Sequence, residues 1–187
     1  MSPWSLPTAL SVGGREYAIR WDYRVALYLM GVLAGDELEL DEKAAVCLQV
    51  LYRDWQTIPE EHRQEALDKA AAFLDGALPS REGRKGPRLM DWERDGALIV
   101  PAVNRVLGRD VRLEEQMHWW TFLGAYMEIG ESLFASVLAI RRKRAQGKKL
   151  DRQEQQFLRE NRALVEPGRR DDASERARRE ALRELFV

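Results

Sequence analysis

The chain has 187 residues, of which 45% are hydrophobic and 33% are charged, and its 30 Lys and Arg residues nearly balance 31 Asp and Glu. This composition indicates a folded protein, because disorder requires low hydrophobicity together with a high net charge. The formal net charge of −1 argues against a dedicated nucleic-acid-binding protein, which usually carries a large basic excess.

The apolar stretches and the cysteine content suggest where the protein works. No apolar run approaches the roughly 18 residues of a transmembrane helix. The first residues lack the basic start and apolar run of a secretory signal. Cys47 is the single cysteine, so the chain forms no internal disulfide. We therefore expect a cytoplasmic protein that has no contact with the membrane.

Two short strands, residues 10–12 and 17–19, are the first predicted elements. Gly13 and Gly14 stand between them and supply the positive φ angles that a tight hairpin turn requires. A two-stranded hairpin alone is marginally stable in water. It should therefore pack on helices or offer an edge to a partner.

Helical spacing of apolar residues begins after the hairpin. Asp22 is a predicted N-cap, and the first helix should end at Gly35. Asp41 is expected to cap the second helix, and Pro59 stands in the predicted first turn of the third, which should end near Gly76. The predicted fold class is mainly α, a helical bundle with a short N-terminal β-hairpin.

Residues 79–88 are the clearest predicted linker or long loop, since two prolines, two glycines and four basic residues there offer nothing to a core. They divide an N-terminal part, residues 1–78, from a helical C-terminal part, residues 89–166. Residues 167–187 follow as a charged C-terminal helix or tail. The sequence leaves open whether the two parts are separate domains or one bundle with a long loop.

Several helices are predicted within residues 89–166. Asp91 is a candidate cap for the first, and Pro101 should kink or interrupt it. Gly108 should end it, and Asp110 should open the next helix. Asp151 is predicted to cap a later one.

Residues able to carry catalysis or bind a metal are few. Zinc needs three or four ligands, whereas the chain has only His62, His118 and Cys47 as nitrogen or sulfur donors. Cys47 lies among apolar neighbours, as a small buried hydrophobe does. No phosphate-binding glycine loop is present. We expect no enzyme, no metal and no cofactor, and we interpret His118 as a ring hydrogen-bonded beside a tryptophan-rich core.

A basic run within residues 141–149 has two interpretations. It is either a phosphate-binding patch or a solvated helix end that complements the helix dipole, and we favour the second. Its basic residues are Arg141, Arg142, Lys143, Arg144, Lys148 and Lys149.

Two apolar features are candidate partner-binding sites. Trp119 and Trp120 are adjacent, so on a helix they point about 100° apart, and one is expected in the core with the other more exposed. Leu182, Leu185 and Phe186 form the apolar tip of the charged C-terminal segment. The tip either docks in a groove of a partner or of a second copy, or it packs loosely on its own chain.

Several stretches of the sequence form a pattern. The first are Leu6-Pro7, Val12-Gly13-Gly14 with Tyr17 and Ile19, and Asp22-Tyr23-Arg24-Val25. The later ones are Leu89-Met90-Asp91-Trp92 with Asp95 and Ile99, Asp110 with Leu113, His118-Trp119-Trp120 with Phe122, and Ile140-Arg141. Over most of residues 6–165 the chain resembles the gene-product-fifteen family of tailed phages and prophages. Pro101 departs from the uninterrupted helix that is usual in that family.

The resemblance implies a role in phage tail assembly, because the family's gene typically lies between the genes for the major tail protein and the tape-measure protein. It implies a chaperone in the host cytoplasm that coats the tape-measure protein until tail-tube subunits polymerise around it. Such a chaperone needs apolar grooves for amphipathic helices, and a homo-oligomer is compatible with it. The alternatives are a structural tail or connector component of the virion, and a helical nucleic-acid-binding regulator that uses the basic run.

Overall fold

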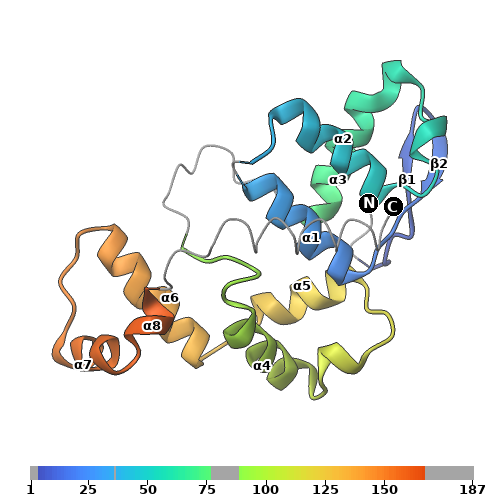
Figure 1. Ribbon diagram of the computed structural model, residues 1–187. Coiled ribbons are helices and arrows are strands. Elements are labelled where there is room, and N and C mark those ends of the chain that lie inside the picture. The colour runs from blue at the N-terminus through green and yellow to red at the C-terminus, as the bar shows by residue number, and fades with distance from the viewer. Residues whose placement is uncertain (1–3, 36, 77–88, 167–187) are drawn as a thin grey trace. The chain divides into compact units, whose positions relative to one another are not determined.

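Figure 1 shows the computed structural model of the protein, which describes residues 4–35, 37–76 and 89–166. These residues form one antiparallel two-stranded sheet and eight α-helices. The strands are β1 (Ala9–Val12) and β2 (Arg15–Ala18), and the α-helices are α1 (Tyr23–Ala34), α2 (Leu40–Leu51), α3 (Arg63–Leu74), α4 (Gly96–Leu107), α5 (Trp119–Met127), α6 (Leu133–Ala145), α7 (Arg152–Glu160) and α8 (Arg162–Val165). The predicted mainly α fold with an N-terminal hairpin is confirmed.

The chain divides into two compact units. Unit 1 takes its described residues from Met1–Glu82 and Glu114–Gly124, and unit 2 takes them from Gly83–Leu113 and Ala125–Glu175. Unit 1 therefore holds the hairpin, the first three helices and most of α5, whereas unit 2 holds α4, α6, α7 and α8. The segment 89–166 contributes to both units. The predicted linker 79–88 and the tail 167–187 lie outside the described residues.

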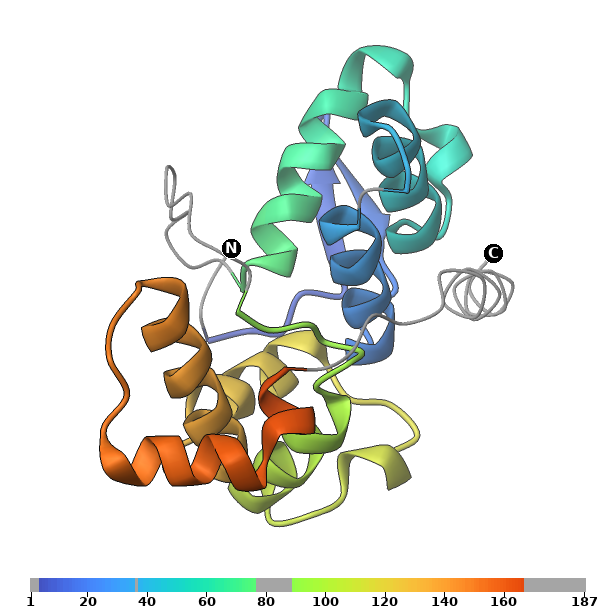
Figure 2. The ribbon, with the colours of Figure 1, turned by 60° about the vertical axis from the view of Figure 1, so that its left-hand side comes forward.

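The hairpin of unit 1 turns at the predicted glycines, and its second strand begins at Arg15, earlier than the predicted Tyr17. Gly13 and Gly14 have φ angles of 56° and 76°, and Val12 pairs with Arg15 on either side of them. Helix α3 lies along β1 (Figure 2). The Gly13 N–H donates to Glu65 on that helix at 2.9 Å, so the turn is fixed to α3.

Helix α1 begins and ends where the sequence predicts. Asp22 is its N-cap, with a carboxylate oxygen that accepts the Arg24 N–H at 2.9 Å, and Gly35 is its C-cap. Helix α2 begins earlier than the predicted cap at Asp41. Its N-cap is Glu39, because Glu39 and Glu42 form a reciprocal capping box.

Helix α4 differs from the prediction at its start and in its course. It begins at Gly96, and its N-cap is Asp95 rather than Asp91. It also continues through Pro101 to a left-handed Gly108 at its end. Pro101 and Ala97, the residue whose carbonyl loses its bond, are both exposed. Water can therefore satisfy that carbonyl, which explains why the proline is accommodated.

The helix predicted from Asp110 is much shorter than expected. Only a 3-10 turn forms at Val111–Leu113, and α5 begins at Trp119. The reason is tertiary, because the residues before α5 pair with an extended segment of the N-terminal region. The Tyr23 N–H donates to Met117 O, and the Trp119 N–H donates to Trp21 O, both at 2.9 Å.

Unit 2 has a small apolar core. One of its clusters consists of the buried Val137, Ile140 and Val165, with partly buried side chains of α4, α7 and α8 packed against them. Ile99, Val103 and Phe134 are also buried in this unit. The predicted cap at Asp151 is confirmed, since its side chain accepts the Glu154 N–H at 2.9 Å. Among the described helices, none combines the length and the apolar character needed to cross a membrane.

The hairpin turn gives a first prediction. A Cβ at Gly13 would lie 2.6 Å from Cδ2 of His62, whereas a Cβ at Gly14 would meet nothing within 4 Å. Both substitutions force a side chain into the left-handed region, at a cost of about 1–2 kcal/mol. Gly13→Ala should therefore lower the free energy of unfolding in urea more than Gly14→Ala does. The difference should vanish in a His62→Ala background, and equal losses in the unmodified background would contradict this account.

Candidate functional site

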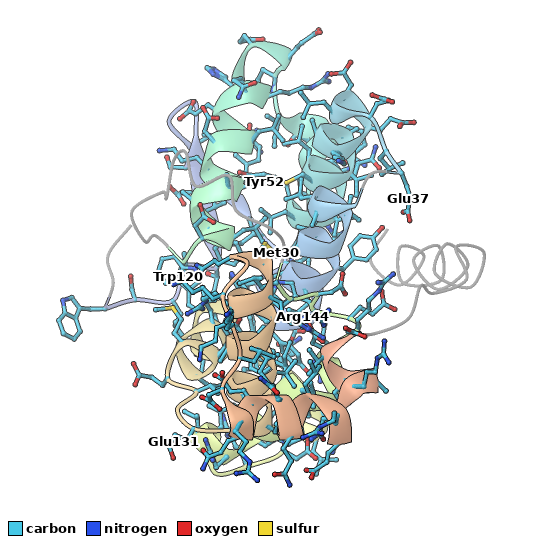
Figure 3. All side chains as sticks on the ribbon, turned by 90° about the vertical axis from the view of Figure 1, so that its left-hand side faces the viewer. Met30, Glu37, Tyr52, Trp120, Glu131 and Arg144 are labelled. Atoms are coloured by element: carbon cyan, nitrogen blue, oxygen red, sulfur yellow. The ribbon has the colours of Figure 1, made fainter. Side chains whose placement is uncertain are left out.

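The two adjacent tryptophans bind the carboxyl end of α3. The indole Nε1 of Trp119 donates to Leu74 O at 2.9 Å, and that of Trp120 donates to Phe73 O at 2.8 Å. The last carbonyls of a helix have no partner within it, so these bonds satisfy two of them. Trp119 is 0% exposed, and a ring buried to this degree has no surface to offer a partner. Trp120, labelled in Figure 3, is half-buried and keeps some accessible surface.

His118 caps α5 and is held in one tautomer. Its Nδ1 accepts the Trp120 N–H at 3.0 Å, so the ring proton is on Nε2, which donates to Pro7 O at 3.0 Å. The ring also stacks on Trp21. Burial lowers the pKa of His118, although the bond to Pro7 opposes this shift. The interpretation of His118 as a hydrogen-bonded residue beside a tryptophan-rich core is confirmed.

Arg141, the first residue of the basic run, connects several segments of unit 2 through hydrogen bonds. Its two terminal nitrogens donate to both carboxylate oxygens of Asp95, at 2.7 and 2.9 Å. Its other N–H groups donate to the carbonyls of Leu89, Leu164 and Val165, at 3.0, 2.6 and 3.0 Å. All five donors of the guanidinium are thus used. Because the Arg141 side chain is only 12% exposed, it joins α6 to α4 and α8 rather than facing solvent.

Carboxylates also pair with two further residues of the run. Lys143 contacts Glu154 at 2.5 Å, and Arg144 pairs with Glu166. Arg142, Lys148 and Lys149 are exposed. Only three of the six cations are therefore without an acidic partner in the part of the chain that the structure describes. This arrangement weakens the phosphate-patch interpretation.

The remaining predicted site residues, Leu182, Leu185 and Phe186, lie outside the described residues. Cys47 is buried, and burial raises the pKa of its thiol to about 11, so it remains protonated. Across residues 4–35, 37–76 and 89–166, no three metal-ligating side chains gather in one place.

The structure exposes apolar side chains that sequence reasoning missed. In unit 2, Leu113 is 84% exposed, Met127 53%, Leu133 46% and Val106 40%. Leu113 lies in the segment where a helix was predicted to begin at Asp110. Asp110 accepts the backbone N–H of Arg112 and pairs with its guanidinium, which are the same contacts that Asp22 makes with Arg24 at the start of α1. The local sequence therefore gave no sign that the helix would be replaced by a short turn.

Hydrogen bonds join the segments that carry Val106, Leu113 and Leu133. Arg105, near the end of α4, donates to Glu131 O at 2.6 Å, just before α6. The Val111 N–H donates to the Asn104 side chain at 2.8 Å, which attaches the 3-10 turn to α4. The end of α4, the turn after it and the start of α6 are therefore held together. We call Val106, Leu113, Met127 and Leu133 the apolar surface of unit 2.

His118 gives a prediction about pH. Because burial holds the pKa of His118 in the folded chain below the ordinary value of an imidazole, the unfolded chain binds a proton first as the pH falls, and stability decreases. The free energy of unfolding should thus drop more between about pH 7.5 and about pH 5.5 in the unmodified chain than in His118→Asn, which can still cap the helix but does not titrate. A His62→Gln chain retains His118 and should show the full drop. Equal slopes for His118→Asn and the unmodified chain would refute the assignment.

Arg141 gives a prediction about stability. Arg141→Gln would leave the Asp95 carboxylate, 3% exposed, without its cation, and should cost about 3–5 kcal/mol. Arg142→Gln, at the exposed neighbour, should change stability by no more than about 0.5 kcal/mol. Chemical unfolding followed by circular dichroism measures the stability of both variants. In Arg141→Gln, the backbone amides of α4 and α8 should exchange their hydrogens faster than in the unmodified chain. Similar losses for the two variants would disprove the central role of Arg141.

Comparison with known proteins supports the family resemblance that was found in the sequence. No curated protein and no solved structure matches the chain. A family model described as Bacteriophage Gp15 protein matches residues 5–166, a range that includes every described helix and strand. The resemblance to the gene-product-fifteen family is thus confirmed. The chain belongs to the Bacteriophage Gp15 protein family, whose members are phage proteins of a structural or assembly-related kind.

Proposed function

We propose that the chain is a non-enzymatic tail-assembly chaperone that binds the tape-measure protein in the host cytoplasm, with tail-tube subunits as a further partner. The observation that carries this proposal is the family match over residues 5–166. The chaperone role is the one that the family's place among the tail genes implies.

The apolar surface of unit 2 supports the proposal. Single exposed apolar residues are ordinary, but several on adjoining segments are typical of protein-binding surfaces. Leu113 and Met127 are each more than half exposed, and the segments that carry the surface are fixed by hydrogen bonds. We infer that these residues together contact one face of an amphipathic helix, the form in which a tape-measure protein would present its apolar residues.

The two tryptophans have a different role in this proposal. Trp119 stabilises the carboxyl end of α3 from within the core. Trp119 is therefore not a contact residue in this proposal, whereas the half-buried Trp120 keeps accessible surface.

Co-expression with the tape-measure protein tests the proposal. The unmodified chain should keep the tape-measure protein soluble and co-elute with it. A double variant, Leu113→Glu with Leu133→Glu, should bind it about tenfold or more weakly, because charges would replace apolar contacts. Leu40→Glu is the matched control, since Leu40 is 80% exposed on α2 of unit 1 and should bind as the unmodified chain does.

Two results would count against the proposal. If the tape-measure protein stays insoluble or elutes apart from the unmodified chain, the chaperone function is wrong. If mass spectrometry finds the chain at stoichiometric levels in purified virions, it is a structural component of the particle instead.

A further inference from the structure

A small hollow opens on the surface of unit 1. Its volume is about 150 Å³, below the roughly 300–1,000 Å³ of pockets for drug-sized ligands. The space suits the end of one side chain rather than a nucleotide. The residues that line it are Arg20, Trp21, Asp22, Val25, Arg53 and Gln116.

The guanidinium of Arg20 is held in place through only one of its three nitrogens. Its Nη1 donates to the carbonyls of Gln49, Val50 and Tyr52, at 3.2, 3.1 and 3.1 Å, around the carboxyl end of α2. Nothing in the described parts of the chain accepts a bond from its Nε or Nη2. These two nitrogens form the side of a guanidinium that can bind both oxygens of a carboxylate at once.

Arg53 lies on the same side of the backbone as Arg20. Ile19 and Tyr52 pair across an isolated antiparallel bridge, and both side chains are buried, at 1% and 0% exposure. Since successive side chains of extended backbone alternate between its two faces, Arg20 and Arg53 point away from that core. Burial and the nearby Arg53 lower the pKa of Arg20, whereas Asp54 raises it. The two cations are therefore close enough to repel each other.

The acidic group that lines the hollow is already engaged. One oxygen of Asp22 accepts the Arg24 N–H at 2.9 Å, the other accepts the Met117 N–H at 3.0 Å, and the Arg24 guanidinium pairs with both. Asp22 thus serves the backbone and Arg24. It leaves Arg20 and Arg53 to act on a ligand, beside the apolar surfaces of Trp21 and Val25.

We propose that this hollow binds a carboxylate, supplied by an acidic side chain of a partner protein. The carboxylate accepts two bonds from Nε and Nη2 of Arg20 and faces Arg53, while the methylene groups of the incoming side chain lie against Trp21 and Val25. An acidic side chain fits better than a free anion because the hollow joins cationic donors to apolar surface. The inference goes beyond the chaperone proposal and holds whichever protein is the partner.

Binding of paired synthetic peptides to the full chain tests the inference. One short helical peptide carries Glu on its polar face, and its control carries Gln at the same positions. Two-dimensional NMR of the arginine Nε–H groups reports the contact. The Glu peptide should shift the Arg20 and Arg53 signals, the Gln peptide should not, and acetate and inorganic phosphate should bind more weakly than the Glu peptide.

Three variants locate the site. Arg20→Lys retains the positive charge but lacks the paired Nε and Nη2 donors, so the Kd of the Glu peptide should rise about tenfold or more. Arg53→Gln should raise it about threefold or more, because one of the two cations is removed. Arg63→Gln, an exposed arginine at the start of α3, should leave it unchanged.

The outcomes separate the alternatives. If Arg20→Lys fails to fold, Arg53→Gln decides, since the Arg53 side chain is exposed. Equal binding of the Gln peptide, an unchanged Kd in Arg53→Gln, or the same loss in Arg63→Gln would overturn the inference. So would tighter binding of phosphate, or of acetate, than of the Glu peptide. Because no tape-measure protein is present, these results are independent of the chaperone experiment.

Discussion

Short helices leave much of their backbone unpaired, and this constraint explains several of the long-range polar contacts in the protein. Each α-helix has four terminal carbonyls with no intrahelical partner, and the longest described helix, α6, has only 13 residues. Side-chain N–H donors from distant segments satisfy these carbonyls. The indoles of Trp119 and Trp120 bind the end of α3, Arg20 binds the end of α2, and Arg141 binds the carbonyls of α8. Each contact also fixes one segment of its unit against another.

The same constraint determines which residues remain for binding. Tryptophans and arginines are the side chains most enriched in protein interfaces, and here several of them stabilise helix ends instead. Arg141 uses all five of its donors within unit 2, and Trp119 is fully buried in unit 1. Among the groups that remain accessible are the apolar surface of unit 2 and the side of Arg20 that holds no carbonyl. These two features have different chemistry, so they can recognise different groups on a partner.

Local sequence signals predict much of the fold, whereas the candidate sites depend on distant contacts. Gly13 and Gly14, the cap at Asp22 and the left-handed Gly108 each act within a few residues, and each was predicted. The bond from Trp119 to Leu74 spans 45 residues, and the pair of Arg141 and Asp95 spans 46. The spacing of apolar residues along the sequence gives no information about partners so far apart. The helix expected from Asp110 fails for the same reason, since the backbone near Met117 pairs with residues 21–23.

Unit 1 is discontinuous in sequence, and both its stability and its hollow depend on the returning segment, Glu114–Gly124. That segment supplies both indole donors to α3, the ring of His118 that binds Pro7, and Gln116, which lines the hollow. A chain that ended before it would leave the carbonyls of Phe73 and Leu74 without these partners and Asp22 without the Met117 N–H. Contacts of this sequence separation form late, because a long loop must close first. Unit 1 therefore completes its fold only after α4 of unit 2 has been synthesised, and the carboxylate site exists only in the continuous chain.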